Sequence, residues 1–155
     1  MDQTDVRGLL FRGAITVSAA FGDDDEEIPA ARALARSFLT DLQAVHGFPV
    51  SGRVMGMVQL VVSELVTNTR KYAPGPCLVT LEVQHGAVEV SVWDSSTTLP
   101  AVLAQGPARI GRHGLEIVMA VSKSFQVQRE PVGKRITAAI VLADDPDGDV
   151  AGHKL

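Results

Sequence analysis

Two neighbouring stretches of the chain, residues 78–83 and 88–92, alternate apolar with more polar side chains and are joined through the short segment QHG. Alternation with a period of two is typical of a strand that buries one face. A tight turn between two such strands pairs them in opposite directions, as a β-hairpin. This hairpin predicts an antiparallel sheet, and every other element has to be placed around it.

Three more stretches are predicted to be strands. The first, AITVSAAF, alternates larger apolar residues with smaller or polar ones, as a half-buried strand requires. Its inward side chains are expected to be Ile15, Val17, Ala19 and Phe21. The other two, SFQVQRE and KRITAAIVL, flank a PVG turn near the end of the chain and are predicted to pair through it.

A helix is expected from Pro29 to about Val45. The acidic run GDDDEE ahead of it complements the positive N-terminal end of a helix, and HGFP breaks the helix at the other end. The side chains predicted to share its buried face are Ala33, Leu34, Phe38, Leu42 and Val45.

A second helix is predicted to begin near Ser51, whose hydroxyl suits an N-cap. With about 100° of rotation per residue, its apolar stripe consists of Val54, Val58, Val61, Leu65 and Tyr72, flanked by Val62. Along the near edge of that stripe lie Met57, Glu64 and Asn68, whereas the side chains facing away are Ser63, Thr67 and Arg70. This helix is thus expected to half-shelter a carboxylate and a carboxamide.

Glu64 and Asn68, one helical turn apart, allow two interpretations. In the structural one, Glu64 pairs with Lys71 or Arg70, and Asn68 is a satisfied amide at the edge of the helix. In the functional one, both residues serve a binding site. Partly sheltered polar residues are common at helix edges, so the helix by itself favours the structural interpretation.

The segment 95–110 has no clear period, and the apolar sequence GLEIVMAV after it predicts a third helix that starts near Gly114. The order of elements favours an α+β fold: a two-layer α/β sandwich with a mixed, mostly antiparallel sheet and helices on one face. We expect one domain over residues 11–142, an N-terminal extension over 1–10 and a flexible polar tail over 143–155.

Composition excludes several classes of protein. A chain of 155 residues with 46% hydrophobic content suits one globular domain, and a net charge of −4 argues against a nucleic-acid partner. The single cysteine, Cys77, has no disulfide partner within the chain. No stretch approaches the roughly 20 apolar residues of a membrane span, and the acidic N-terminus does not suit a signal peptide. The expected location is the cytoplasm, without membrane contact.

Four motifs, taken in order, resemble those of the gyrase, histidine kinase, chaperone and mismatch-repair ATPase superfamily. ELVTNTRKYA resembles its N box, with matches at Glu64, Asn68, Lys71 and Tyr72. Asp94 at the end of VSVWD is similar to the start of the G1 box, GRHGLEIV resembles the G2 box, and GKRITAAIVL resembles the last strand. The chain is most similar to bacterial anti-sigma factor serine kinases, which implies the Bergerat-type ATPase fold.

The resemblance implies an ATP site with Mg²⁺. Asn68 would hold the metal, and Glu64 would act as general base towards the attacking hydroxyl or water. Lys71, one turn beyond Asn68, is either a residue that neutralises phosphate charge or a solvated helix residue. Asp94 would accept hydrogen bonds from the adenine amino group, which guanine replaces with a carbonyl. The phosphates would be bound by the G2 segment, through Gly111, Arg112, Gly114 and Leu115.

One part of the pattern departs from the family. The G1 box continues as DxGxG in the family, whereas Ser96 and Thr98 occupy the glycine positions of this chain. Hydroxyl residues lack the backbone freedom of glycine. A complete histidine kinase is also not expected, because no histidine lies in a separate dimerisation helix.

The resemblance implies an anti-sigma factor that is also a serine/threonine protein kinase. Such a protein phosphorylates an anti-anti-sigma partner and regulates transcription by partner switching. Its expected partners are therefore a sigma factor and an anti-anti-sigma protein, and a homodimer is possible through the first strand and helix. Two alternatives stay open: a catalytically weak or inactive binding module of the same fold, which the altered G1 box favours, and a hydrolase acting on ATP alone.

Overall fold

The computed structural model describes residues 15–22, 27–73, 75–96 and 113–142. The strands are β1 (Ile15–Phe21), β2 (Cys77–Gln84), β3 (Ala87–Asp94), β4 (Ser124–Arg129) and β5 (Lys134–Val141). The helices are α2 (Glu27–Ala44), α3 (Gly52–Tyr72) and α5 (His113–Val121). The predicted N-terminal extension and C-terminal tail lie outside the described residues.

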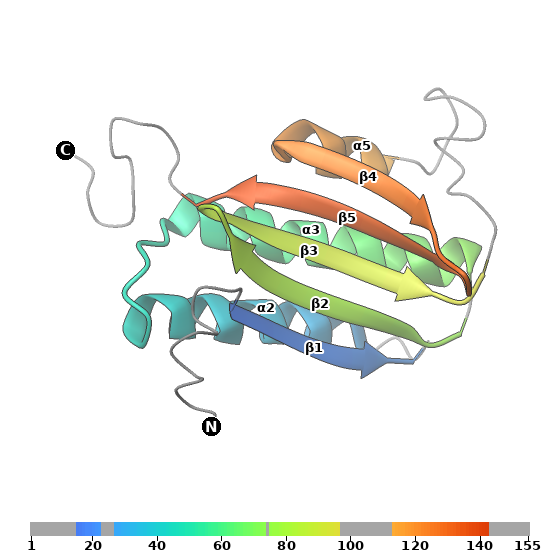
Figure 1. The fold of residues 1–155 in the computed structure, drawn as a ribbon, viewed down its shortest axis with the longest axis horizontal. Coiled ribbons are helices and arrows are strands. Elements are labelled where there is room, and N and C mark those ends of the chain that lie inside the picture. Colours follow the sequence, from blue (N-terminus) through green and yellow to red (C-terminus); the bar gives the residue numbers. More distant parts are fainter. Residues whose placement is uncertain (1–14, 23–26, 74, 97–112, 143–155) are drawn as a thin grey trace.

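The strands form one five-stranded sheet in the order β1-β2-β3-β5-β4, and each neighbouring pair is antiparallel. The described helices lie together on one face of this sheet (Figure 1). Helix α3 packs against both α2 and α5 and contacts the central strands, so it forms the middle of the helical layer. The predicted α+β two-layer architecture is confirmed.

Local sequence signals explain where several elements begin and turn. The side chain of Ser51 caps α3 by accepting a hydrogen bond from the backbone N–H of Val54 at 3.0 Å, as predicted. Between β2 and β3, His85 and Gly86 both adopt positive φ, at 52° and 76°. Such backbone angles match the right-handed twist of paired strands and fix the register of this hairpin.

The predicted face of the first helix needs correction. Ala33 is exposed, and Val45 is 70% exposed because α2 ends at Ala44 and Val45 lies in the following turn. The side chains of α2 that the core buries are Ala31, Ala35, Phe38, Leu39 and Leu42. The helix also begins earlier than predicted, at Glu27, so Pro29 lies in its first turn, where a missing N–H is tolerated.

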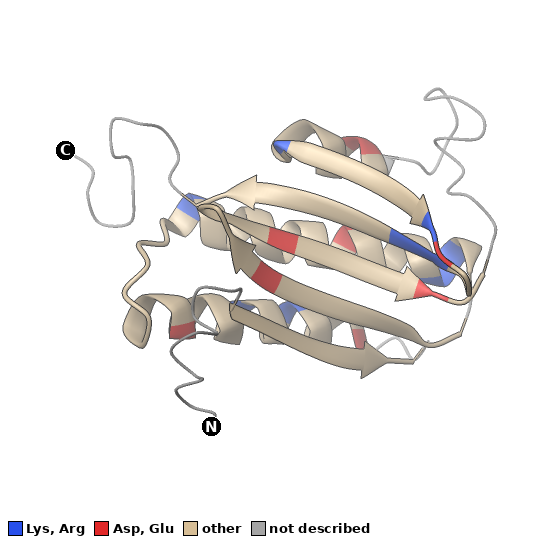
Figure 2. Cartoon of the chain, in the orientation of Figure 1, with Lys and Arg blue, Asp and Glu red and all other residues tan. Residues whose placement is uncertain are grey.

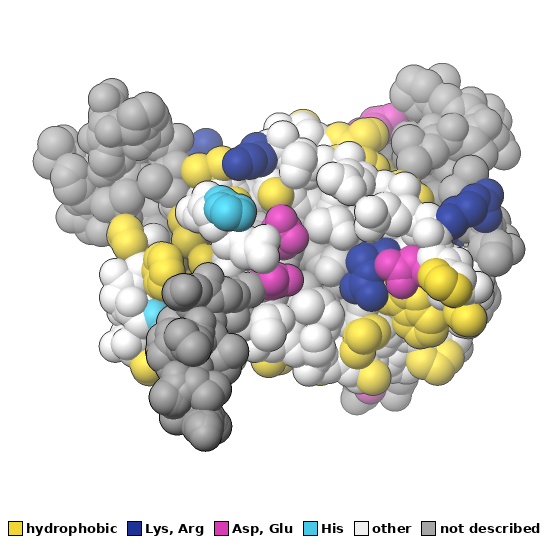
Figure 3. Space-filling model, in the orientation of Figure 1, with side chains coloured by type: hydrophobic (Ala, Val, Ile, Leu, Met, Phe, Trp, Pro, Cys, Tyr) yellow, Lys and Arg dark blue, Asp and Glu magenta, His cyan; other side chains and the backbone are white. Residues whose placement is uncertain are grey.

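The core lies between the helices and the sheet. From α3 it contains Val54, Val58, Val61, Val62, Leu65 and Val66, and from the central strands Val79, Leu81, Val88, Val90, Val92, Ile136 and Ile140. The opposite face of the sheet is covered mainly by polar side chains, and Figure 3 shows this face. Every described helix is too short or too polar to cross a membrane.

Candidate functional site

Helix α3 carries the first two candidate residues, Glu64 and Asn68, and both are half-buried as predicted. Glu64 reaches the start of α5: a Cβ atom added to Gly114 would overlap the carboxylate of Glu64. A side chain at this position would therefore have to displace the end of the Glu64 side chain. Two residues that the sequence places far apart are thus neighbours.

The start of α5 lies beside this carboxylate. The first backbone N–H groups of a helix have no partner within it, so they can bind anionic groups. Leu115 has its side chain in the core, and only its backbone amide is suited to such a role. Gly111, Arg112 and Thr98 lie outside the described residues, and α5 begins at His113.

The end of the sheet carries the third candidate residue, Asp94. Cross-strand register aligns Cys77 of β2, Asp94 of β3 and Lys134 of β5 in one row. Each of the three is only 2% exposed. Figure 2 shows acidic and basic positions side by side where β3 and β5 meet at this end of the sheet.

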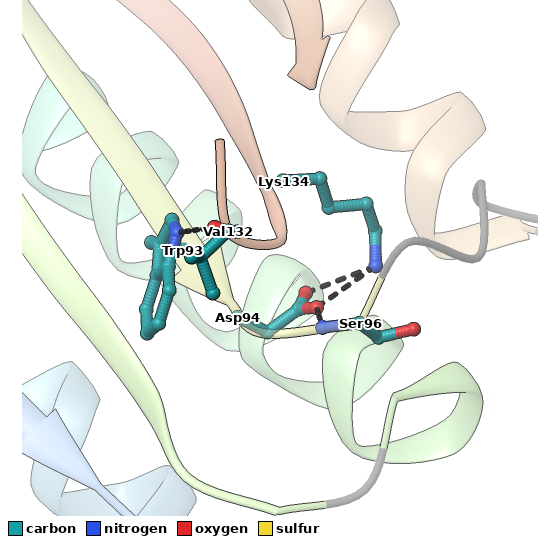
Figure 4. Close-up of polar contacts among 5 residues, drawn as sticks. All are labelled: Trp93, Asp94, Ser96, Val132 and Lys134. Carbon is teal, nitrogen blue, oxygen red and sulfur yellow. Dashed lines mark hydrogen bonds and ion pairs between the residues drawn. The ribbon is translucent and has the colours of Figure 1, made fainter. Parts of the chain in front are cut away.

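Lys134 forms a buried ion pair with Asp94. Its Nζ lies 3.0 Å from Oδ1 and 3.0 Å from Oδ2 of the carboxylate (Figure 4). The sequence-based prediction missed Lys134. A signal was present, since alternation along β5 puts Lys134 on the same inward face as Ile136 and Ala138, and an inward lysine requires a buried partner.

The backbone after Asp94 adds a further donor to this carboxylate. The N–H of Ser96 donates to Oδ1 of Asp94 at 2.8 Å. Among the described residues, only His85 combines a side chain with positive φ, so Ser96 has an ordinary backbone conformation. The serine at this glycine position of the family pattern is therefore accommodated without backbone strain.

The turn between β4 and β5 is held against the end of β3 by a hydrogen bond. The indole N–H of Trp93 donates to the carbonyl of Val132 at 2.9 Å. Gly133 has φ of +83°, and a Cβ atom there would collide with the backbone carbonyl of Asp94. Since only glycine fits both constraints, this turn holds Lys134 in its place at the start of β5.

The remaining N-box residues lie towards the surface. Lys71 is exposed, with its Nζ 5.9 Å from the ring centroid of Tyr72. Arg70, predicted to face away from the core, is half-buried, and its charge opposes the pKa shift of the Cys77 thiol. A role for Lys71 in phosphate binding therefore stays a prediction.

Burial changes the chemistry of Cys77. Loss of solvent, together with the negative charges of Asp94 and Glu27, raises the pKa of its thiol from 9.0 to about 11. The thiol is therefore protonated at neutral pH, and a protonated thiol is a poor nucleophile and a poor metal ligand. Cys77 has a packing role in the row with Asp94.

The two sides of the site differ in how well they fit a nucleotide with Mg²⁺. On the helix side, Asn68 offers the hard oxygen donor that Mg²⁺ prefers, and Glu64 is one turn away, with its carboxylate against Gly114 of α5. On the sheet side, Lys134 already engages the carboxylate expected to bind adenine. The helix side fits the predicted role, and the sheet side departs from it.

Comparison with one solved structure supports the fold. The RsbU and RsbW domains of Rv1364c from Mycobacterium tuberculosis match with a TM-score of 0.60 and 16% identity, over 83% of this chain and 32% of that one. This chain therefore spans about a third of that protein. The histidine kinase domain of the blue-light-activated histidine kinase EL346 from Erythrobacter litoralis matches with a TM-score of 0.44 and 20% identity, over 72% of this chain and 61% of that one.

The sequence itself gives the family. No protein of curated function matches the chain. The family model described as "histidine kinase-like ATPase domain" matches residues 26–140, which include α2, α3, α5 and strands β2 to β4 in full. The chain therefore belongs to the family of histidine kinase-like ATPase domains.

Proposed function

We propose that this chain is an ATP- and Mg²⁺-dependent serine/threonine protein kinase that also acts as an anti-sigma factor. It phosphorylates an anti-anti-sigma protein and sequesters a sigma factor when that partner is phosphorylated. Membership of an ATPase-domain family implies ATP as the nucleotide. The fold similarity to a structure that contains an RsbW domain supports this choice within the family.

One observation carries the catalytic part of the proposal. Glu64 and Asn68 lie one turn apart on α3, and the carboxylate of Glu64 meets α5 at Gly114. A base beside the metal and the phosphates is the arrangement that phosphoryl transfer to a hydroxyl requires.

Each residue has a distinct role in this mechanism. MgATP, when bound, supplies the γ-phosphoryl group that is transferred. Glu64 accepts the proton of the attacking serine or threonine hydroxyl of the partner protein. Asn68 would direct its side-chain oxygen to the metal, and the first amides of α5 would hold phosphate oxygens. Lys71 would neutralise phosphate charge from the exposed side of the helix.

The test is transfer to a protein. The purified chain is incubated with MgATP and each candidate anti-anti-sigma protein from the same genome, and intact mass is measured. A gain of about 80 Da on one partner, the mass of one phosphoryl group, is expected. If ATP binds but no candidate partner gains mass, the chain is not a kinase for this class of protein.

A second candidate function is supported by the Asp94–Lys134 ion pair. A chain whose base-binding carboxylate is already neutralised is suited to hold a protein partner without catalysing transfer. Calorimetry separates the two functions. Tight binding of a sigma factor that is the same with and without MgATP favours this binding module, whereas ATP-dependent binding followed by transfer favours the kinase.

A further inference from the structure

The carboxylate of Asp94 has donors on both oxygens. Oδ1 accepts from the backbone N–H of Ser96 at 2.8 Å and from Nζ of Lys134 at 3.0 Å, while Oδ2 accepts from the same Nζ at 3.0 Å. The side chains of Asp94 and Lys134 are 2% and 3% exposed. A ligand atom that binds this carboxylate must therefore displace Lys134 or share the carboxylate with it.

The position of Lys134 is built into the fold. It pairs with Asp94 in the register of β3 and β5, and it follows directly after Gly133, whose positive φ and close approach to Asp94 fix the turn. The hydrogen bond from Trp93 to Val132 holds the same turn from the other side. The turn and the strand register thus hold the ammonium group against the carboxylate.

Adenine and lysine would both donate hydrogen bonds to this carboxylate. The adenine amino group is an N–H donor, and so is the lysine ammonium, which carries three N–H groups. The ammonium has the advantage of its charge, because charge-assisted hydrogen bonds are stronger than those of a neutral amine. Adenine must therefore displace or share a stronger donor before it can bind.

We propose that Lys134 sets the nucleotide affinity and base preference of this site, by holding the carboxylate that an adenine amino group would bind. This inference rests on the proposed function, since it takes Asp94 as the base-binding residue. The unmodified chain then binds ATP weakly, and any event that moves Lys134 away from Asp94 strengthens binding. Lys134 acts here as an internal competitor of the base.

Titration calorimetry with MgATP tests the inference on the full chain. Lys134→Met keeps the length of the side chain and removes its donors. We expect it to bind ATP about tenfold more tightly or better, since a released charged acceptor regains a hydrogen-bond partner. Arg135→Met is the matched control, because Arg135 is the next residue, points to the opposite face and pairs with Glu130 at 3.0 Å. The affinity of the Arg135→Met variant for ATP should equal that of the parent chain.

Base selectivity separates this role from a general change in the fold. Guanine carries a carbonyl where adenine carries the amino group, so the gain in Lys134→Met should be larger for ATP than for GTP. The double variant Asp94→Asn with Lys134→Met should lose most of the gain for ATP, because the charged acceptor is absent. If Lys134→Met does not fold, Lys134→Gln replaces it, with a smaller gain expected in the same direction.

The outcomes separate the inference from the proposed function. Equal or weaker ATP binding by Lys134→Met, with transfer by the parent chain intact, overturns the inference and leaves the kinase in place. Tight ATP binding by Lys134→Met alone supports the inference and assigns the parent chain to the binding-module class. Absence of ATP binding in both overturns the inference and removes the nucleotide-dependent function with it.

Discussion

The two sides of the candidate site, on helix α3 and at the end of the sheet, differ in burial and in how their charged groups are paired. On the helix side, Glu64 and Asn68 are half-buried, and the Glu64 carboxylate lies against Gly114 in the first turn of α5. On the sheet side, Asp94 and Lys134 are almost fully buried and neutralise each other. Matching a family's pattern residue by residue therefore does not mean that each residue is ready for the family's ligand.

The largest effect is expected from the helix side. Glu64→Gln keeps the size of the side chain and removes its basic oxygen, so transfer to the partner protein should fall about 10²–10⁴-fold, the usual contribution of a general base. ATP affinity should change little. Steady-state transfer by intact mass measures the first and calorimetry the second, with Glu89→Gln on the open face of the sheet as control. A variant that transfers at the parent rate excludes Glu64 as the base.

The sheet side should dominate stability. Removing Lys134 leaves a buried carboxylate without its partner, and breaking such a pair costs about 3–5 kcal/mol. Urea unfolding of Lys134→Met should show a loss of this order, whereas Arg135→Met, whose ion pair is partly exposed, should lose about 1 kcal/mol or less. Similar losses in the two variants would mean that the buried pair stabilises no more than a surface pair.

Gly114→Ala tests the contact between the helices. The new Cβ meets only the end of the flexible Glu64 side chain, so that carboxylate is expected to swing away while the backbone stays in place. The free energy of unfolding should change by about 1 kcal/mol or less, since alanine also favours the helix. Transfer should fall about tenfold or more because the base is misplaced. A large loss of stability with an unchanged transfer rate would contradict this assignment.

The smallest effect concerns the buried thiol beside Asp94. Folding raises the pKa of Cys77 from 9.0 to about 11, so the folded state holds its proton more tightly than the unfolded state. This contribution to stability is complete below pH 9 and is lost as the pH rises towards 11. The decline in stability over this range should be smaller in Cys77→Ala. Equal declines in the two chains would assign the pH dependence to other groups.

Local patterns were sufficient to predict most of the fold. The alternation in β1, β2 and β3, the cap at Ser51 and the half-buried positions of Glu64 and Asn68 depend on residues close together in the sequence. Val45 shows the limit of this reasoning. Periodicity placed it on the buried face of a helix, but the helix ends one residue earlier, and side chains beyond a helix end no longer follow its period.

The contacts that define the site depend on long-range packing. The pairing of Asp94 with Lys134 follows from the register of β3 with β5, which joins residues 40 positions apart. The approach of Glu64 to Gly114 follows from how α3 packs against α5. Neither can be derived from periodicity, and for this reason the family pattern predicted Asp94 as a site residue but not its neutralised state.

The hydrogen bond between Trp93 and Val132 makes Trp93 fluorescence sensitive to the state of the β4–β5 turn. The chain contains one tryptophan, which precedes Asp94 directly and holds the turn that carries Lys134. Any rearrangement that loosens that turn breaks an indole hydrogen bond and alters the polarity around a single fluorophore. Tryptophan emission of the unlabelled chain therefore reports on the sheet side of the site, because the helix side has no tryptophan.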